Sequence, residues 1–149
     1  MKELEEKRDR SLGKIISELS RLSGMYFQKQ FKRYDIGPSQ VTTLHFISRH
    51  NGITQSDLTH FLNLDKSSVS SQLHTLEKNG YIVRIAAKDD NRIKKIYISE
   101  KTRTIESPLH NVFTSWTDTL LADLSEEERE QLFLLLEKVK GNAKKRYGK

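Results

Sequence analysis

The fold is decided by residues 52–84, which read GITQSDLTHFLNLDKSSVSSQLHTLEKNGYIVR. Thr54 and Asp65 each stand where a side-chain oxygen can accept a hydrogen bond from a free amide in the first turn of a helix. Residues 63–64 form a tight turn between the two short helices, and the Asn-Gly pair at 79–80 ends the second. Two short helices joined by a tight turn predict a helix-turn-helix.

A β-hairpin is predicted directly after the second short helix. Residues 81–86 and 93–99 are rich in Ile, Val and Tyr, a composition that favours strands. Residues 87–92 between them read AKDDNR, which favours a turn. A hairpin in this place is a wing, so residues 36–100 are predicted to form a winged helix-turn-helix.

Longer helices are predicted on both sides of this part, because apolar residues recur there at three- and four-residue spacing. The spacing predicts one helix over residues 5–33. A second helix opens at Pro38 or Ser39 and ends at residues 51–52. The helical period returns from Ile105 to Leu121.

A last helix follows Ser125, which forms a capping box with Glu128. This helix is expected to bury Leu132, Phe133, Leu135, Leu136 and Val139 before a basic, frayed tail. The predicted fold class is therefore mainly α with a small β-hairpin wing. It has six helices and a single domain over residues 1–149.

The outer segments, residues 1–35 and 101–149, are expected to form an interleaved dimerisation region. They are rich in Leu, Ile and Phe, and one small winged domain cannot cover all of those apolar faces. A partner subunit can cover them, and two-fold dimers are the commonest such assembly. Two-fold symmetry would place the second short helix of one subunit about 34 Å from the same helix of its partner, which is one turn of double-stranded DNA.

The second short helix, residues 66–78, has one apolar side and one hydrogen-bonding side. Val69, Leu73 and Leu76 fall together on the core side of a helical wheel. The opposite side carries short polar side chains, which allow a helix to approach base edges and phosphates in the major groove. The DNA-binding residues predicted on this helix are Lys66, Ser67, Ser68, Ser70, Ser71, Gln72, His74, Thr75 and Lys78.

The wing is expected to supply most of the electrostatic attraction. Residues 81–104 contain seven basic and three acidic residues, a net charge of +4, and a basic patch is the usual footprint of phosphate binding. Arg92 at the hairpin tip is placed to enter the minor groove. Asp90 is placed to hold the Arg92 guanidinium by a charge-assisted bond, and Lys94 completes the predicted DNA-binding set.

Each of these features also has an ordinary explanation. A serine-rich exposed helix face is usually a solvated surface, and an exposed Asp-x-Arg pair is usually worth less than about 1 kcal/mol. DNA binding is favoured by their order along the chain: helix, tight turn, polar-faced helix, basic hairpin.

Composition limits the remaining classes of protein. The 149 residues carry a net charge of +6 and are 35% hydrophobic and 31% charged, which favours a soluble globular domain. The N-terminus is charged and lacks the apolar region of a signal peptide, and the apolar runs are too short to cross a membrane. The chain has no cysteine, which fits a cytoplasmic protein. No membrane partner is expected.

An enzyme is not expected. The sequence has no nucleophile elbow, phosphate loop, metal-ligand spacing or paired catalytic carboxylates, and its five histidines are scattered. No catalytic residue, metal or cofactor is therefore predicted. Two alternatives stay open: a winged-helix module that binds another protein without any ligand response, and a DNA-binding protein that takes no ligand.

Residues 52–58, 64–70 and 76–84 resemble the MarR (multiple antibiotic resistance regulator) family, as do Asp90-Asn91-Arg92 and Ile98-Ser99 in the wing. The resemblance covers essentially the whole chain in the order and spacing of its elements. It implies a sequence-specific transcription regulator, a repressor, that acts as a triangular homodimer on an inverted-repeat operator in double-stranded DNA. It also implies that Arg84 joins the pair formed by Asp90 and Arg92.

The resemblance further implies release from DNA by a small aromatic acid such as salicylate. The acid would bind in a cleft between the dimer helices and the DNA-binding part, and the cleft residues are Arg21, Gln40, His45 and Arg92. The sequence departs from the family pattern at Thr102, where the family often has glycine, so the helix after the wing is expected to start differently. The absence of cysteine excludes the thiol-oxidising sensors of the family.

Overall fold

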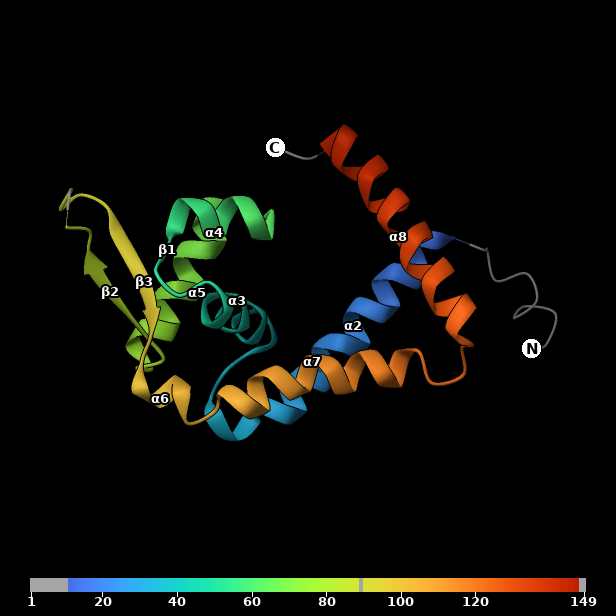
Figure 1. Cartoon of the computed structure of the whole chain (residues 1–149), viewed down its shortest axis with the longest axis horizontal. Coiled ribbons are helices and arrows are strands. Elements are labelled where there is room, and N and C mark those ends of the chain that lie inside the picture. The colour runs from blue at the N-terminus through green and yellow to red at the C-terminus, as the bar shows by residue number, and fades with distance from the viewer. Residues whose placement is uncertain (1–10, 89, 148–149) are drawn as a thin grey trace.

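The computed structural model describes residues 11–88 and 90–147. In chain order these residues form α2 (Leu12–Phe31), the 3-10 helix η1 (Lys32–Tyr34), α3 (Pro38–Arg49), β1 (Ile53–Thr54), α4 (Gln55–Leu62), α5 (Lys66–Lys78), β2 (Ile82–Ala86), β3 (Lys94–Ile98), α6 (Glu100–Arg103), α7 (Glu106–Leu120) and α8 (Glu126–Tyr147). Figure 1 shows the winged part at one end of the molecule, with α2, α7 and α8 extending from it. No helix within the described ranges is both long and apolar enough to span a membrane.

The predicted fold class is confirmed, with one difference in the helices. The described residues contain seven α-helices where the sequence predicted six, because the four-residue helix α6 follows the wing directly. Its N-cap is Ser99, whose hydroxyl accepts a hydrogen bond from the Thr102 amide. The first helix was predicted from residue 5. The structure has it from Leu12, and residues 5–10 lie outside the described ranges.

The wing belongs to a three-stranded antiparallel sheet with strand order β1-β3-β2. In the hairpin, Ile82 pairs with Ile98 and Ala86 pairs with Lys94. The sequence did not predict β1, which has only two residues and pairs with Lys95 and Ile96. Gly52, just before β1, has a φ of +92°, a left-handed conformation that favours glycine.

Three helix starts confirm the predicted caps. The Thr54 hydroxyl accepts from the Asp57 amide at 3.1 Å, which opens α4. The Asp65 carboxylate accepts from the Ser68 amide at 2.8 Å, which opens α5. Ser125 and Glu128 form the reciprocal capping box, with bonds of 3.2 and 2.8 Å. These contacts satisfy amides that have no partner inside their helices.

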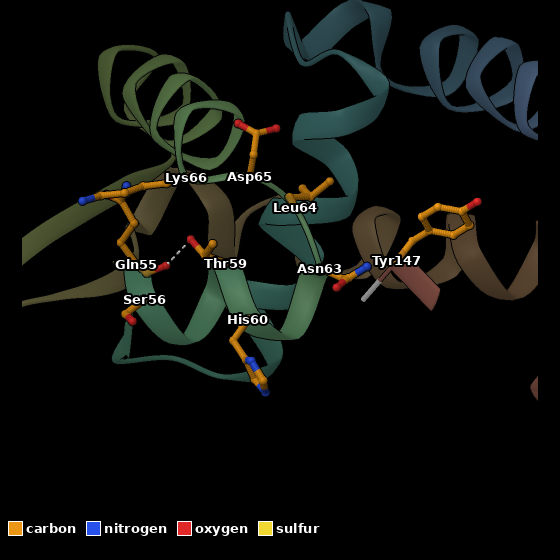
Figure 2. Close-up of a pocket in the computed structure, with 9 residues that line it drawn as sticks. All are labelled: Gln55, Ser56, Thr59, His60, Asn63, Leu64, Asp65, Lys66 and Tyr147. Carbon is orange, nitrogen blue, oxygen red and sulfur yellow. Dashed lines mark hydrogen bonds between the residues drawn. The ribbon is translucent and has the colours of Figure 1, made fainter. Parts of the chain in front are cut away.

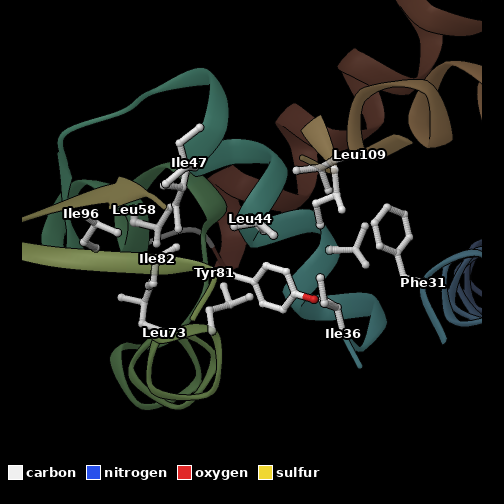
Figure 3. Packing of buried hydrophobic residues seen from close by; sticks show 14 of the residues in the cluster. Phe31, Ile36, Leu44, Ile47, Leu58, Leu73, Tyr81, Ile82, Ile96 and Leu109 are labelled. Carbon is white, nitrogen blue, oxygen red and sulfur yellow. The ribbon is translucent and has the colours of Figure 1, made fainter. Parts of the chain in front are cut away.

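One hydrophobic core joins α3, α4, α5, the sheet and the near ends of α2 and α7 (Figure 3). Helix α5 contributes Val69, Leu73 and Leu76, all fully or almost fully buried, as its helical wheel predicted. Leu44 of α3 and Leu58 of α4 lie in the same cluster. This core fixes the two helices of the helix-turn-helix and the wing relative to one another.

The prediction that α8 buries its apolar side chains is wrong for the single chain. No residue of α8 is buried, and Phe133, Leu134, Leu135 and Leu136 are 43–66% exposed. Their apolar faces find no matching surface on the winged part of the same chain. The basic tail is also not frayed as predicted, because α8 continues to Tyr147.

Candidate nucleic-acid interface

Helix α5 presents a continuous exposed polar face. Of the DNA-binding residues predicted on this helix, six are exposed and three are half-buried. The exposed ones are Lys66, Ser67, Ser70, Ser71, His74 and Lys78, and the half-buried ones are Ser68, Gln72 and Thr75. Within the described ranges, the side chains of Ser70, Ser71 and His74 make no hydrogen bond. These three side chains are therefore open to a ligand outside the chain.

The other polar side chains of α5 bond within the protein. The hydroxyls of Ser67 and Ser68 both donate to the Asp65 carboxylate, at 2.5 and 2.7 Å, and these bonds hold the pKa of Asp65 well below its usual range. The Thr75 hydroxyl donates to the Ser71 carbonyl oxygen at 3.1 Å. Ser67, Ser68 and Thr75 thus stabilise the helix whether or not they also meet a nucleic acid.

Gln72 is fixed from the core side of α5. The buried hydroxyl of Thr43 on α3 donates to the Gln72 side-chain carbonyl oxygen. This bond draws the Gln72 oxygen toward α3, and the Gln72 amide nitrogen, which makes no hydrogen bond within the described ranges, can donate outward. The sequence could not have shown this contact, since the two residues are 29 positions apart.

The wing tip carries a bidentate ion pair between Asp90 and Arg92. Arg92 Nε and Nη2 each lie 3.1 Å from a different carboxylate oxygen of Asp90, and the Arg92 backbone amide donates to the same carboxylate at 2.9 Å. These bonds lower the pKa of Asp90. The Arg92 side chain is nevertheless 90% exposed, so it projects into solvent in a fixed direction.

Arg84 does not join this pair as the resemblance implied. Its Nε lies 3.1 Å from Glu77 on α5, and its Nη1 donates to Gln55 on α4 at 3.4 Å. Arg84 therefore ties strand β2 to both helices of the helix-turn-helix. Arg84 stands opposite Ile96 within the paired strands of the hairpin, whereas Asp90 lies in the turn beyond them.

A groove of about 310 Å³ runs between the start of α4 and the wing. Three basic side chains, Arg84, Arg92 and Lys94, line it together with Gln55 and Ser56. The structure thus brings two of the predicted wing residues, Arg92 and Lys94, to one surface. A groove lined by several cations attracts phosphate groups.

Figure 2 shows a second, larger hollow of about 610 Å³ beside the turn between α4 and α5. Gln55 and Ser56 from the first turn of α4 line it, as do Asp65 and Lys66 at the start of α5. Tyr147 from the end of α8 closes one side. Helix N-termini carry partial positive charge and favour anions, and Lys66 adds a full charge.

Gln55 and Ser56 were missed by the sequence prediction of site residues. Both follow Thr54, the N-cap of α4, so they occupy the first turn of a helix. That position was readable from the sequence, because the cap itself was predicted. The rule that helix N-termini bind anions would have selected them.

The predicted cleft residues Arg21, Gln40, His45 and Arg92 do not line a common pocket among those found in the described ranges. Arg21 is exposed on α2 and lies 4.0 Å from Glu18. The Gln40 side chain accepts a bond from the Gly37 amide at 2.7 Å. Arg92 is on the wing, at the other end of the molecule from α2 (Figure 1).

His45 has the most unusual surroundings of these four residues. Its ring stacks on Phe113 of α7, with centroids 4.3 Å apart, and lies 6.0 Å from the ring of His110. Its Nε2 is buried and makes no hydrogen bond within the described ranges. Burial lowers the pKa of His45, and the nearby His110 and Arg49 lower it further.

Comparison with known proteins agrees with this geometry. The sequence profile of the MarR family matches residues 34–93. The HTH-type transcriptional regulator BilQ of Clostridioides difficile (strain CD3) is 25% identical over 130 residues, which cover 87% of this chain and 88% of the relative.

Solved structures match over nearly the full length. A MarR transcriptional regulator from Methanosarcina mazei Go1 is 28% identical with a TM-score of 0.81, covering 90% of this chain and 96% of that one. A MarR family regulator from Listeria monocytogenes, complexed with 26mer DNA, is 26% identical with a TM-score of 0.76, covering 94% and 95%. Residues 34–93 thus match the MarR family, and over nearly its full length the chain is similar to solved MarR transcriptional regulators.

Proposed function

We propose that this chain is a sequence-specific DNA-binding repressor that acts as a homodimer on an inverted-repeat operator. The observation that carries the proposal is the pairing of two surfaces. Helix α5 has an open face of short polar side chains, and the adjacent wing holds the exposed guanidinium of Arg92 in a fixed direction. The Listeria relative, which is complexed with DNA, supports the same assignment.

In this proposal α5 enters the major groove. Ser70, Ser71 and His74 are the candidates for contacts with base edges, because their side chains are exposed and make no bond within the described ranges. Lys66 and Lys78 lie at the two ends of the helix, where they can meet phosphates. Short side chains on the exposed face allow the helix to come close to the bases.

The wing and the start of α4 contribute affinity for DNA rather than sequence-specific contacts with bases. Arg92 enters the neighbouring minor groove, where narrow A·T-rich stretches attract arginine. Lys94 and Arg84 share a groove with Arg92 and add positive charge along the DNA backbone. Each phosphate that these cations neutralise makes binding weaker as salt rises.

The homodimer is supported by apolar surface that the single chain leaves open. On α2, six large apolar side chains are 39–57% exposed: Leu12, Ile15, Ile16, Leu19, Leu22 and Met25. On α8, Phe133 to Leu136 are also exposed. Contiguous exposed apolar faces of this kind mark protein interfaces. A two-fold dimer through these helices would leave both copies of α5 free.

Repression and ligand release complete the proposal. A dimer that covers an operator excludes other proteins from the same DNA, so we propose repression. The proposed ligand is a small aromatic acid such as salicylate, bound near His45, with Gln40 on the same helix α3 and Arg21 on α2. The unpaired Nε2 of His45 supports this site, because a carboxylate or hydroxyl would supply the missing partner.

Fluorescence anisotropy on the DNA upstream of the protein's own coding sequence tests the proposal, over a salt series with and without salicylate. Tight binding that weakens steeply between 50 and 200 mM salt is expected, with a weaker affinity when salicylate is present. Binding that salicylate leaves unchanged would overturn the ligand but keep the regulator. No binding at low salt to this DNA or to a random duplex would favour a winged-helix module that binds another protein.

A further inference from the structure

Both chain segments that connect the winged part to the outer helices meet at the C-terminal end of α5. The incoming segment is Tyr34-Asp35, at the end of η1 and before α3. The outgoing segment runs from Ser99 through α6 toward α7. Residues 79–81, which end α5 and lead into β2, touch both segments.

Helix α5 ends in a tightly bonded cap. Gly80 has a φ of +76° and donates its amide to the Glu77 carbonyl oxygen at 3.0 Å. The Tyr81 amide donates to the Leu76 carbonyl oxygen at 2.8 Å. This pair of bonds is the Schellman arrangement. The backbone of residues 79–81 is therefore fixed relative to the last turn of α5.

The cap is joined to the incoming segment by two hydrogen bonds. The Tyr81 hydroxyl donates to the Tyr34 carbonyl oxygen at 2.6 Å, and the Asn79 side-chain amide donates to the Asp35 carbonyl oxygen at 3.3 Å. Tyr81 is only 2% exposed, and Figure 3 shows its hydroxyl directed toward Ile36 at the start of the next segment. Asp35 itself has a φ of +55°, so the chain turns sharply at this contact.

The cap is joined to the outgoing segment from the other side. Lys101 Nζ donates to the Asn79 carbonyl oxygen at 2.7 Å and lies 4.2 Å from the centroid of the Tyr81 ring. The buried hydroxyl of Thr102 donates to the Tyr81 carbonyl oxygen, and the Ser99 hydroxyl donates to the Gly80 carbonyl oxygen at 2.6 Å. Thr102, where the family often has glycine, thus has a bonding role here.

We propose that Tyr81 is a positioning residue that sets the direction of α5 relative to the outer helices, and thereby the spacing of operator half-sites that the dimer accepts. The proposal rests on the proposed function. Tyr81 has no exposed surface with which to touch DNA, so it acts through α5. Tyr81 bonds to the incoming segment through Tyr34 and to the outgoing segment through Thr102. The outward-facing residues of α5 bond to neither segment.

The lever is long enough for a small change to matter. Helix α5 has 13 residues, which is about 20 Å at 1.5 Å per residue. A tilt of the winged part by about 10° at this cap therefore moves the N-terminal end of α5 by about 3.5 Å, the step between base pairs. In a two-fold dimer that displacement occurs in both half-sites, so it changes the spacing that fits.

The test compares Tyr81→Phe with Tyr34→Phe. The first change removes the hydroxyl that bonds the cap to the incoming segment but keeps the ring beneath Lys101. The second removes a hydroxyl from the same junction and leaves the accepting carbonyl group in place. Anisotropy is measured on one half-site and on inverted repeats whose half-site spacing varies by single base pairs.

Tyr81→Phe is expected to bind the best-spaced repeat about three- to tenfold more weakly, the size of one lost hydrogen bond, and to accept neighbouring spacings more evenly. Its affinity for a single half-site should not change. Tyr34→Phe should match the parent throughout. A spacing profile for Tyr81→Phe identical to that of the parent would overturn the proposal. If Tyr81→Phe does not fold, Asn79→Ala replaces it, with the same outcomes.

A measurement without DNA separates this inference from the proposed function. The chain has no cysteine, so Ser71→Cys on α5 and Ser107→Cys on α7 can carry spin labels, diluted with unlabelled chain to isolate distances within one chain. Tyr81→Phe should broaden or shift the distance distribution, and an unchanged distribution would contradict the inference. A parent that binds no inverted repeat would refute the proposed function, and the spin-label distances would then decide the inference by themselves.

Discussion

Asp90 holds Arg92 through both carboxylate oxygens at 3.1 Å while the Arg92 side chain stays 90% exposed. An exposed pair of this kind adds little to stability. It does restrict the rotamers of a long side chain, which lowers the entropy that the side chain loses on binding. The pair is therefore better understood as an arginine prepared for a ligand.

Arg92→Ala is expected to weaken binding to operator DNA by about ten- to a hundredfold, the usual cost of one specific arginine contact. Arg103→Ala is the matched control. It removes the same charge from α6, where Arg103 pairs with Glu100. Anisotropy gives the affinities and sedimentation gives the oligomeric state. Equal DNA affinities for Arg92→Ala and the parent would contradict the assignment of the wing to the DNA interface.

Changing both Leu132 and Leu136 to Glu should dissociate or unfold the dimer, because four charges per dimer would enter an apolar interface. Lys138→Glu on the same helix is the control, since Lys138 is exposed beside them. Sedimentation velocity reads the oligomeric state, and circular dichroism reads the fold. A folded monomeric double variant that still binds a full inverted repeat tightly would rule out the interleaved dimer.

His45 makes stability depend on pH in a defined direction. Burial first, then His110 and Arg49, lower the pKa of His45 below its ordinary value of 6.5. The unfolded chain therefore binds the proton more readily, and the free energy of unfolding falls as pH drops below about 6.5. The loss ends once pH is below the lowered pKa of the folded state.

Urea unfolding at pH 7.5 and pH 5.5 measures this dependence. His45→Phe should lose less stability than the parent over that interval, because it removes the titrating group and keeps an aromatic ring against Phe113. His74→Gln, on the exposed face of α5, should retain the dependence of the parent. The idea fails if the parent and His45→Phe lose the same stability on acidification.

Thr43→Val tests the link between α3 and the outward face of α5. The change removes the hydroxyl that bonds Gln72 and keeps the shape of the buried side chain. It should lower the free energy of unfolding by about 1 kcal/mol. DNA affinity should also fall if a fixed Gln72 contributes to the interface. Thr42→Val, one position away and outside this contact, is the control. Equal free energies of unfolding for the Thr43→Val and Thr42→Val proteins would contradict the account.

The parts of the fold that depend on neighbours in sequence were predictable. The caps at Thr54, Asp65 and Ser125 each involve residues three positions apart, so their signals are local. The buried side of α5 followed from its helical period, which needs no knowledge of what covers it. The same holds for the hairpin, since its strands are close in sequence.

The contacts that the sequence could not predict join distant residues. Strand β1 exists only because Ile53 and Thr54 pair with Ile96 and Lys95 of β3. The bond from Tyr81 to Tyr34 spans 47 positions. Arg84 was expected to join Asp90 and Arg92 in the wing. Its position in the hairpin places it beside Glu77 instead. Residue types gave the list of candidates, while the three-dimensional arrangement decided their partners.

The most direct test of the central claim is selection of DNA from a pool of random duplexes by the purified chain. The account predicts that the enriched sequences form an inverted repeat with half-site centres about ten base pairs apart, one turn of DNA, and that Arg92→Ala enriches it far less. Enrichment of an asymmetric single site, or of no sequence at all, would contradict a dimer that reads DNA through two copies of α5.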